Sequence, residues 1–334
     1  MYQHSTVNRR LTLRRVSGII CLIVAGILIA GVLIYALHPN IAIPPPIRSV
    51  LPLPTPASTC KTPPGHPGDH TDTITSSGVR RTMLIHIPPS YGLNPQPLVV
   101  FYHGYSWTAQ NMENNAQTAQ EADKAGFVLV FPQGLETPPT WNAGIGAGNL
   151  TTGSANDIQF TRDLLTHMKQ HYCIDARRIY VTGFSLGGGM AYRAICHLSD
   201  QIAAIATVSG AYYPFPEGCH PQRPLPVMEI HGGADTQAPY NGYPARNMLA
   251  VNDYLNGWLS RDHCSQPSQT FFQQGDVTGI EWTHCASGVS IKHYRVSDGG
   301  HNWPGTPNTT QVINSNQVIW QFFSAYTLPS PPKK

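Results

Sequence analysis

Short apolar runs alternate with amphipathic segments along most of this chain. Runs bounded by Gly and Pro predict buried strands, and segments with helical periodicity predict helices between them. The predicted strands cover residues 79–87, 98–102, 127–131, 179–182, 202–208, 225–230 and 290–296. The predicted helices cover residues 111–125, 156–172, 190–196, 248–260 and 311–326. Strands that alternate with helices indicate an α/β fold, with a mostly parallel sheet covered by helices on both faces.

The amino-terminal segment has a different pattern. Residues 16–37 contain no charged side chain over 22 positions, which is long enough for a helix to cross a bilayer. Four arginines precede this stretch and the next basic residue is Arg48, so the positive-inside rule places residues 1–15 in the cytoplasm and the rest of the chain outside. We expect an uncleaved transmembrane signal anchor, which would tie the protein to the membrane. A cleaved signal, which would release a secreted protein, is the alternative.

Proline then dominates the chain up to the predicted domain. Nine prolines fall in the 26 residues from 39 to 64, a composition typical of an extended polyproline spacer. We therefore predict a linker at 38–64, one α/β domain at 65–328 and a short tail at 329–334. The 275 residues from Cys60 onward are enough for one large domain with a full core.

The charge of this body argues against nucleic-acid binding. From residue 60 onward the chain carries 16 Lys and Arg against 18 Asp and Glu, so the positive balance of the whole chain comes from its amino terminus. Six cysteines in an exported body predict three disulfides. Short separation in sequence favours Cys264 with Cys285 and Cys196 with Cys219, which leaves Cys60 with Cys173. No Cys-x-x-Cys pair is present and the histidines lack ligand spacing, so we expect no metal site.

The sequence Gly183-Phe184-Ser185-Leu186-Gly187 follows a predicted strand and precedes a predicted helix. A Gly-x-Ser-x-Gly turn in this context holds the serine in a strained conformation that exposes its hydroxyl, and bulky side chains two residues away on either side would collide. The alternative is an ordinary glycine-rich turn. We predict that Ser185 is a nucleophile.

A serine nucleophile requires a base and an acid, which α/β-hydrolases supply in the chain order Ser, Asp, His. Asp235 and His301 follow predicted strands and therefore fall at the same edge of the sheet as Ser185. Asp298 is the rival acid, but it lies only three residues from His301 on the same loop. The other histidines considered as bases are in a strand, beside cysteines or too near Asp235: His293, His263, His284 and His231.

Backbone N–H groups must stabilise the oxyanion that forms during ester cleavage. We predict Leu186 N–H as one donor and Tyr105 N–H as the other, with Gly104 N–H as the alternative second donor. His103 is interpreted as a structural hydrogen-bonding residue. Asp157 and Asp163 near a helix start are expected to cap the helix or form ion pairs. Three tryptophans are predicted to line the substrate pocket: Trp303, Trp107 and Trp141.

Residues 67–326 resemble the polyhydroxybutyrate depolymerase-like esterases, a group of α/β-hydrolases that includes feruloyl and acetylxylan esterases. The matching motifs are Phe101-Tyr102-His103-Gly104, Tyr172-Cys173-Ile174-Asp175, the elbow at Ser185, His231-Gly232-Gly233-Ala234-Asp235 and Gly299-Gly300-His301-Asn302-Trp303-Pro304-Gly305. The resemblance implies an exported serine esterase with Ser185, Asp235 and His301 as its triad. Family members often carry Asn where this chain has Leu186, a difference that changes the pocket but spares the backbone donor.

We therefore predict an extracellular serine esterase that needs no cofactor and acts on hydroxyalkanoate oligomers or short-chain esters. Feruloyl or acetyl esters of plant polysaccharide are the alternative substrates. Digestion of solid polyester is not expected, because no polymer-binding module follows the predicted domain. Two further hypotheses are an inactive hydrolase fold that serves as a surface binding module, and a serine peptidase on the same fold.

Overall fold

The computed structural model describes residues 60, 65–92, 94–147, 156–265 and 267–330, all within one compact unit that spans Ala57–Lys334. The predicted membrane span at 16–37, the cytoplasmic segment at 1–15 and most of the linker lie outside the described residues. Within the described part of the chain, no helix has the length and apolar character needed to cross a membrane.

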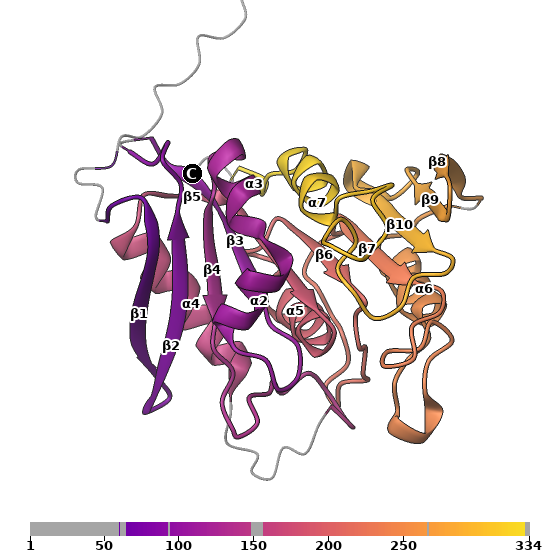
Figure 1. The fold of residues 1–334 in the computed structure, drawn as a ribbon, viewed down its shortest axis with the longest axis horizontal. Helices are drawn as coiled ribbons and strands as arrows, with labels where there is room; N and C mark the ends of the chain where they lie inside the picture. Colours follow the sequence, from indigo (N-terminus) through magenta and orange to yellow (C-terminus); the bar gives the residue numbers. More distant parts are fainter. Residues whose placement is uncertain (1–59, 61–64, 93, 148–155, 266, 331–334) are drawn as a thin grey trace, which may run out of the picture. The chain divides into compact units, whose positions relative to one another are not determined.

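The described strands form one ten-stranded sheet (Figure 1). From one edge to the other, the order is β1 (Gly68–Ser76), β2 (Val79–Ile87), β4 (Val128–Pro132), β3 (Gln96–Tyr102), β5 (Ile174–Phe184), β6 (Ala204–Val208), β7 (Val227–Gly232), β10 (Ile291–Val296), β9 (Val277–Trp282) and β8 (Gln269–Gln274). Pairing is parallel from β4 to β10 and antiparallel at both ends of the sheet. This is the mostly parallel α/β-hydrolase sheet that the sequence predicts.

Helices cover the two faces and form separate cores (Figure 1). One face carries α4 (Asp157–His171), α5 (Leu186–Leu198) and α6 (Val251–Arg261). The other carries α2 (Ala109–Ala116), α3 (Thr118–Ala125) and α7 (Ser315–Ser324). Two 3₁₀ turns, Pro244–Arg246 and Ala286–Gly288, lie in loops. Adjacent residues of β3 serve the two cores in alternation, Val99 on one side and Val100 on the other, which explains why its apolar run is continuous.

Two details of the predicted elements were wrong. The single helix expected over residues 111–125 is two helices, because Gln117 adopts a left-handed conformation with φ of 54° between them. The sequence analysis also missed the outer strands β1, β8 and β9. These antiparallel strands are partly exposed and rich in polar residues, so they lack the apolar run that marks the central strands.

The three predicted disulfides are confirmed: Cys60–Cys173, Cys196–Cys219 and Cys264–Cys285. The first joins the start of the described body to the segment just before β5, across 113 positions of sequence. The carboxyl-terminal end is fastened nearby, since Leu328 N–H donates to the Arg177 carbonyl and Arg177 Nε donates to the Leu328 carbonyl, both at 2.9 Å. Both ends are therefore held near the amino-terminal part of β5.

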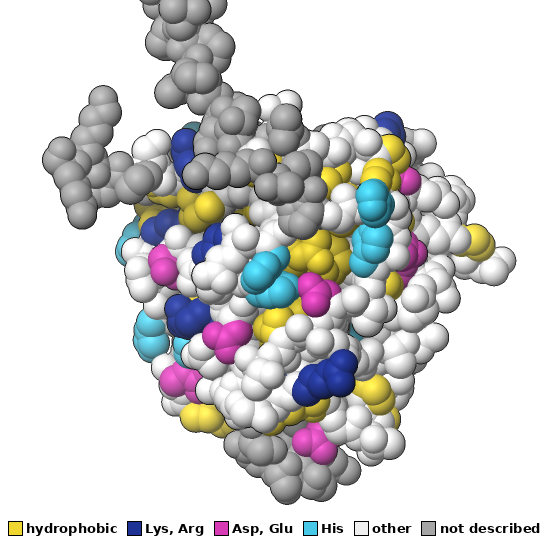
Figure 2. Space-filling model, turned by 90° about the vertical axis from the view of Figure 1, so that its left-hand side faces the viewer, with side chains coloured by type: hydrophobic (Ala, Val, Ile, Leu, Met, Phe, Trp, Pro, Cys, Tyr) yellow, Lys and Arg dark blue, Asp and Glu magenta, His cyan; other side chains and the backbone are white. Residues whose placement is uncertain are grey.

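Acidic, basic and histidine side chains are interspersed on the β1 side of the molecule (Figure 2). No broad surface of one sign is visible on that face, in keeping with the near balance of charges in the body. A cavity of about 780 Å³ lies at this edge, lined by Asp72, His167 and Cys173 among others. None of the predicted catalytic residues lines it.

Candidate active site

Ser185 occupies the sharp turn between β5 and α5 with φ of 55° and ψ of −124°. The left-handed φ is costly for a residue with a side chain, and the turn is held by hydrogen bonds from Ser185 N to Val208 O and from Ala211 N to Ser185 O. A Cβ at Gly183 would collide with the Gly187 carbonyl, and one at Gly187 would collide with the Tyr102 carbonyl. The structure therefore supports the steric reason given for both glycines of the elbow.

Asp235 and His301 meet across the carboxyl ends of β7 and β10. His301 Nδ1 lies 2.7 Å from Asp235 Oδ2, while Asp235 Oδ1 accepts the backbone N–H groups of Gln237 and Ala238 at 2.8 and 2.9 Å. Burial opposes ionisation of this carboxyl group, but hydrogen bonds from His231 and His301 hold the pKa of Asp235 well below its ordinary value. The rival acid Asp298 is exposed, and the His301 ring pairs with Asp235 instead.

Ser185 and His301 line one cavity of about 510 Å³, together with the part-buried Trp107 and residues of the 302–309 loop. The Phe184 ring lies 4.7 Å from the His301 ring and forms part of the wall. A second cavity, of about 850 Å³, opens on Ser185 as well and is lined by Tyr213, Tyr243 and Arg246 among others. Ser185 thus stands where two cavities meet, so an ester bond at its hydroxyl has room for a group on either side.

The main chain at Gly104 lies directly against the serine. A Cβ added to Gly104 would be 3.4 Å from the Ser185 Cβ, so the loop after β3 reaches the position from which it could face an oxyanion. Tyr105 follows and lines both cavities, with 45% of its surface exposed. Leu186 is the first residue of α5, directly after Ser185. Its N–H therefore belongs to the first turn, where backbone donors have no acceptor within the helix.

His103 is a buried structural residue beside this loop. Its Nε2 accepts the Gly134 N–H at 2.9 Å and its Nδ1 donates to the Gly104 carbonyl at 2.7 Å, so the ring is neutral with one donor and one acceptor. Burial lowers the pKa of His103 to about 4. This arrangement agrees with the structural role inferred from sequence and leaves His103 unsuited to act as a second base.

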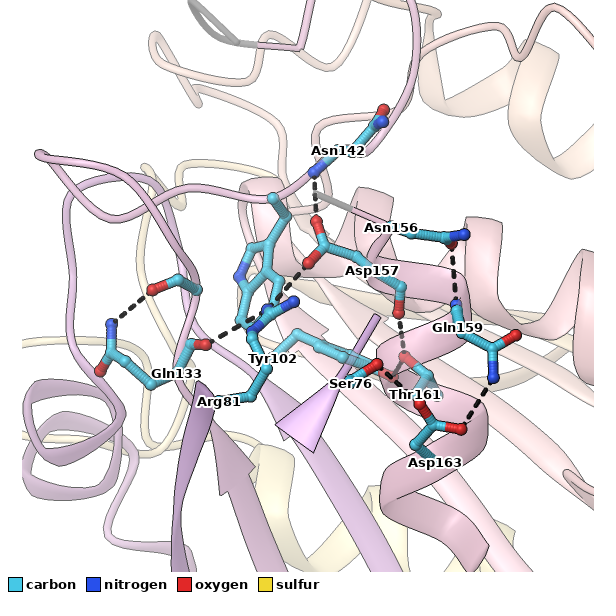
Figure 3. A network of polar contacts seen from close by, with 12 residues as sticks. Ser76, Arg81, Tyr102, Gln133, Asn142, Asn156, Asp157, Gln159, Thr161 and Asp163 are labelled. Atoms are coloured by element: carbon cyan, nitrogen blue, oxygen red, sulfur yellow. Dashed lines mark hydrogen bonds and ion pairs between the residues drawn. The ribbon is translucent and has the colours of Figure 1, made fainter. Parts of the chain in front are cut away.

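A buried ion pair is connected to the His103 loop through residues 141 and 142 (Figure 3). Arg81 Nη2 of β2 lies 2.8 Å from Asp157 Oδ1 of α4, and the other carboxylate oxygen accepts Asn142 N–H at 2.8 Å. Trp141, next in the chain to Asn142, donates its indole N–H to the His103 carbonyl at 2.8 Å. The expectation that Asp157 forms an ion pair is confirmed, and the pair is linked by one loop to the residues beside Ser185.

The three predicted pocket tryptophans have different positions. Trp107 lines the 510 Å³ cavity and its ring lies 5.6 Å from that of Phe184. Trp303 touches the same cavity but is only 2% exposed, with its ring tilted against that of Phe101 in the core at 4.8 Å between centroids. The prediction for Trp141 was wrong, because this residue is fully buried, lines neither cavity beside Ser185 and instead anchors His103.

The sequence analysis missed a buried polar cluster beneath Asp235. Glu229 and His231 of β7 are both almost fully buried, and His231 Nδ1 lies 2.7 Å from Glu229 Oε1. His231 Nε2 lies 2.8 Å from the Ala238 carbonyl and 3.5 Å from Asp235 Oδ2. A glutamate and a histidine two positions apart on a buried strand must share a face, which is a signal that sequence alone contains. Within the described residues, no group of three or more His, Cys, Asp or Glu is arranged to hold a metal ion.

Comparison with known proteins finds similar esterase sequences. A family model described as phospholipase/carboxylesterase matches residues 90–250. A bifunctional acetylxylan esterase/xylanase of Neocallimastix patriciarum is 28% identical over 260 residues, which cover 76% of this chain and 34% of that protein. Feruloyl esterase B of Piromyces equi is 29% identical over 264 residues, which cover 75% of this chain and 46% of that protein. The chain thus spans less than half the length of either relative.

Among solved structures, an acetyl xylan esterase from Aspergillus awamori aligns with a TM-score of 0.56 and 15% sequence identity. The alignment covers 76% of this chain and 99% of that one. At this level of identity the likeness concerns the fold alone.

Proposed function

We propose that the chain is a carboxylic ester hydrolase of the phospholipase/carboxylesterase family that acts on feruloyl or acetyl esters of plant polysaccharide. One observation carries the proposal. Ser185, strained at the tip of its turn, lines the same cavity as a histidine whose other ring nitrogen is held 2.7 Å from a buried carboxylate. This is the set of groups that makes a serine hydroxyl nucleophilic.

The residues act in the following roles. Ser185 Oγ attacks the acyl carbonyl while His301 Nε2 takes its proton, and Asp235 holds the imidazole through Nδ1. The N–H groups of Leu186 and Tyr105 stabilise the oxyanion. His301 then returns the proton to the alcohol that leaves. Water attacks the acyl-enzyme by the same route in reverse, so no cofactor enters the cycle.

The substrate class is inferred from two sources. The relatives named above are feruloyl and acetylxylan esterases, which supports the polysaccharide-ester alternative over hydroxyalkanoate oligomers. The two cavities on either side of Ser185 are also chemically different. We assign the acyl group to the smaller cavity, where Trp107 and Phe184 can contact a feruloyl ring, and the sugar to the larger one, where Arg246 and the hydroxyls of Tyr213 and Tyr243 offer polar groups.

The proposed location is outside the cell. Three disulfides in the described body are typical of exported proteins and unusual in the cytosol. Attachment through residues 16–37 stays a prediction. Treatment of intact cells with a protease, followed by detection of the body in the supernatant or pellet, would separate an anchored protein from a secreted one.

The activity is tested with the full-length chain in mild detergent. The panel consists of p-nitrophenyl acetate and butyrate, methyl ferulate, acetylated xylan and hydroxybutyrate oligomers. We expect hydrolysis of methyl ferulate or acetylated xylan, and a loss of at least about 10³-fold in kcat for Ser185→Ala, because the nucleophile is removed. Equal rates for wild type and Ser185→Ala on every substrate would contradict the proposal.

A fluorophosphonate probe distinguishes the esterase from an inactive binding module. The probe modifies a serine only when a neighbouring base activates it. We expect the wild type to be labelled and Ser185→Ala to remain unlabelled. A wild-type chain that resists labelling would favour the binding module instead.

A further inference from the structure

The buried cluster beneath Asp235 has the geometry of a fixed positive charge. Both ring nitrogens of His231 face oxygen acceptors, Glu229 Oε1 at 2.7 Å and the Ala238 carbonyl at 2.8 Å. A neutral imidazole has one N–H donor, whereas an imidazolium has two. A carbonyl oxygen only accepts, so His231 satisfies both contacts fully when it carries two protons and Glu229 is ionised.

Glu229 has hydrogen-bond partners at Oε1 and an ion-pair neighbour at Oε2, which itself forms no hydrogen bond. Besides His231, the Tyr212 hydroxyl donates to Oε1 at 3.2 Å, and His293 Nδ1 lies 2.7 Å from Oε2 while it also reaches the Glu229 carbonyl at 3.3 Å. Burial opposes ionisation, but the neighbouring His231 lowers the pKa of Glu229 below its ordinary value. Burial likewise opposes protonation of His231, yet Glu229 raises the pKa of His231 to about 10.

We propose that His231 is a positioning residue of the esterase, an imidazolium held by Glu229 that fixes the orientation of Asp235 and keeps the proton collected from Ser185 on His301. The proposal rests on the function proposed above. Asp235 Oδ2 lies between two nitrogens, His301 Nδ1 at 2.7 Å and His231 Nε2 at 3.5 Å. The carboxylate is therefore aimed at His301 from one side and faces a cation on the other.

The positive charge has a consequence for proton transfer. When His301 takes the proton of Ser185, Asp235 is the nearest competing base for a proton at Nδ1. A cation beside Asp235 makes that carboxylate a weaker base, so both ring protons of the His301 imidazolium stay on the ring. His301 Nε2 can then deliver its proton to the leaving alcohol. Loss of the cation would let Asp235 bind the protonated His301 more tightly, so a higher pH would be needed to free the base.

Other charged and titratable groups face this cluster from neighbouring elements. His293 and Arg295 come from β10, which pairs with β7, and the Tyr240 ring is perpendicular to the His231 ring at 5.8 Å between centroids. The Tyr240 hydroxyl lies 2.8 Å from His293 Nε2, and the Arg295 guanidinium lies 5.0 Å from the Tyr240 ring. Tyr212 approaches from the other side, bonded to Thr207. His231 is placed within hydrogen-bonding or ion-pair range of both Glu229 and Asp235, so its replacement should affect the acid most directly.

The test compares His231→Gln with His293→Gln in the full-length chain. Both variants remove a buried imidazole from Glu229, but His293 is not placed against Asp235. For His231→Gln we expect kcat on p-nitrophenyl acetate to fall about 10- to 100-fold with KM within about twofold. The acidic limb of the kcat/KM profile should move to higher pH by on the order of one unit. For His293→Gln we expect neither change.

A second test measures the protonation of His231 in the wild-type protein, so it does not depend on the folding of a variant. In the ¹⁵N-histidine-labelled wild type, both ring nitrogens of His231 should be protonated at pH 7, and contacts of its ring protons to Ala238 and Tyr240 identify the signals. An unprotonated Nδ1, as expected for a neutral ring that accepts a proton from Glu229, would overturn the proposal. Equal loss of kcat in the two glutamine variants, with no shift of the acidic limb, would also overturn it.

Failure of this inference is distinguishable from failure of the proposed function. A wild-type chain that neither hydrolyses the panel nor reacts with the fluorophosphonate probe fails as an esterase, whatever the state of His231. An active, labelled wild type in which His231 is neutral leaves the esterase intact and removes only the positioning role.

Discussion

His103 and His231 are two buried histidines that flank the same site and carry opposite charge states. Each is at most 1% exposed. His103 accepts a backbone N–H at one nitrogen and burial lowers its pKa to about 4, whereas His231 faces only acceptors and its pKa rises to about 10 because of Glu229. At equal burial, the hydrogen-bond partners decide the charge. The neutral ring supports the oxyanion loop, and the charged ring lies under the acid.

The largest expected effect on activity comes from replacing Asp235, the acid that His231 faces. In Asp235→Asn, His301 loses the carboxylate that orients its ring, and we expect kcat on p-nitrophenyl acetate to fall about 10⁴-fold. Asp298→Asn is the matched control, because Asp298 is exposed on the His301 loop, and its kcat should stay within about twofold of wild type. The opposite ranking of the two variants would transfer the acid role to Asp298.

The support behind His103 can be removed as well. Arg81→Met leaves Asp157 buried without its cation, and we expect the free energy of unfolding to fall by about 3–5 kcal/mol in urea titrations. Arg178→Met breaks the more exposed pair with Asp175, which is 2.7 Å long against 2.8 Å for the Arg81 pair, and should cost about 0–1 kcal/mol. Equal effects of the two changes would show that burial does not set the strength of the ion pair.

The pH dependence of stability tests the two rings directly. The pKa of His231 is raised from an ordinary 6.5 to about 10, so its contribution is complete below pH 6.5 and is lost as the pH rises toward 10. The pKa of His103 is lowered to about 4, so its neutral form favours the fold above pH 6.5 and this advantage is lost as the pH falls toward 4. We expect His231→Gln to flatten the alkaline side of the profile and His103→Gln the acidic side. Urea unfolding between pH 4 and 10 measures both.

The centre of the fold could be predicted because burial on both faces leaves a simple pattern. The run Leu98–Tyr102 is continuous and apolar, and it is a strand between two cores. The outer strand β1 was missed because its sequence is polar apart from Gly68 and Ile74, so its position depends on pairing with β2. The break at Gln117 also had no Gly or Pro to mark it, although Gln117 takes a left-handed conformation in which its N–H caps α2 at the Glu113 carbonyl.

The candidate site divides in the same way. Ser185, Asp235 and His301 could be named because each lies in a short motif after a strand, and the sheet brings such loops together. Trp141 could not be placed, because a tryptophan in a loop gives no indication of whether its ring faces solvent or the core. The charge of His231 was also out of reach, since it depends on Glu229, Ala238 and Asp235 meeting in space.

The fastening of Cys60 and Leu328, near the two ends of the described body, to residues 173–177 has a mechanical consequence. A force applied at Cys60 is transmitted through the disulfide to Cys173, directly before the start of β5. The antiparallel pair of β1 and β2 therefore does not carry this force. Ser185 sits at the far tip of the same strand, about 35 Å distant for 11 residues in extended conformation. A load applied through Cys60 or Leu328 would therefore bear on the end of β5 remote from the nucleophile.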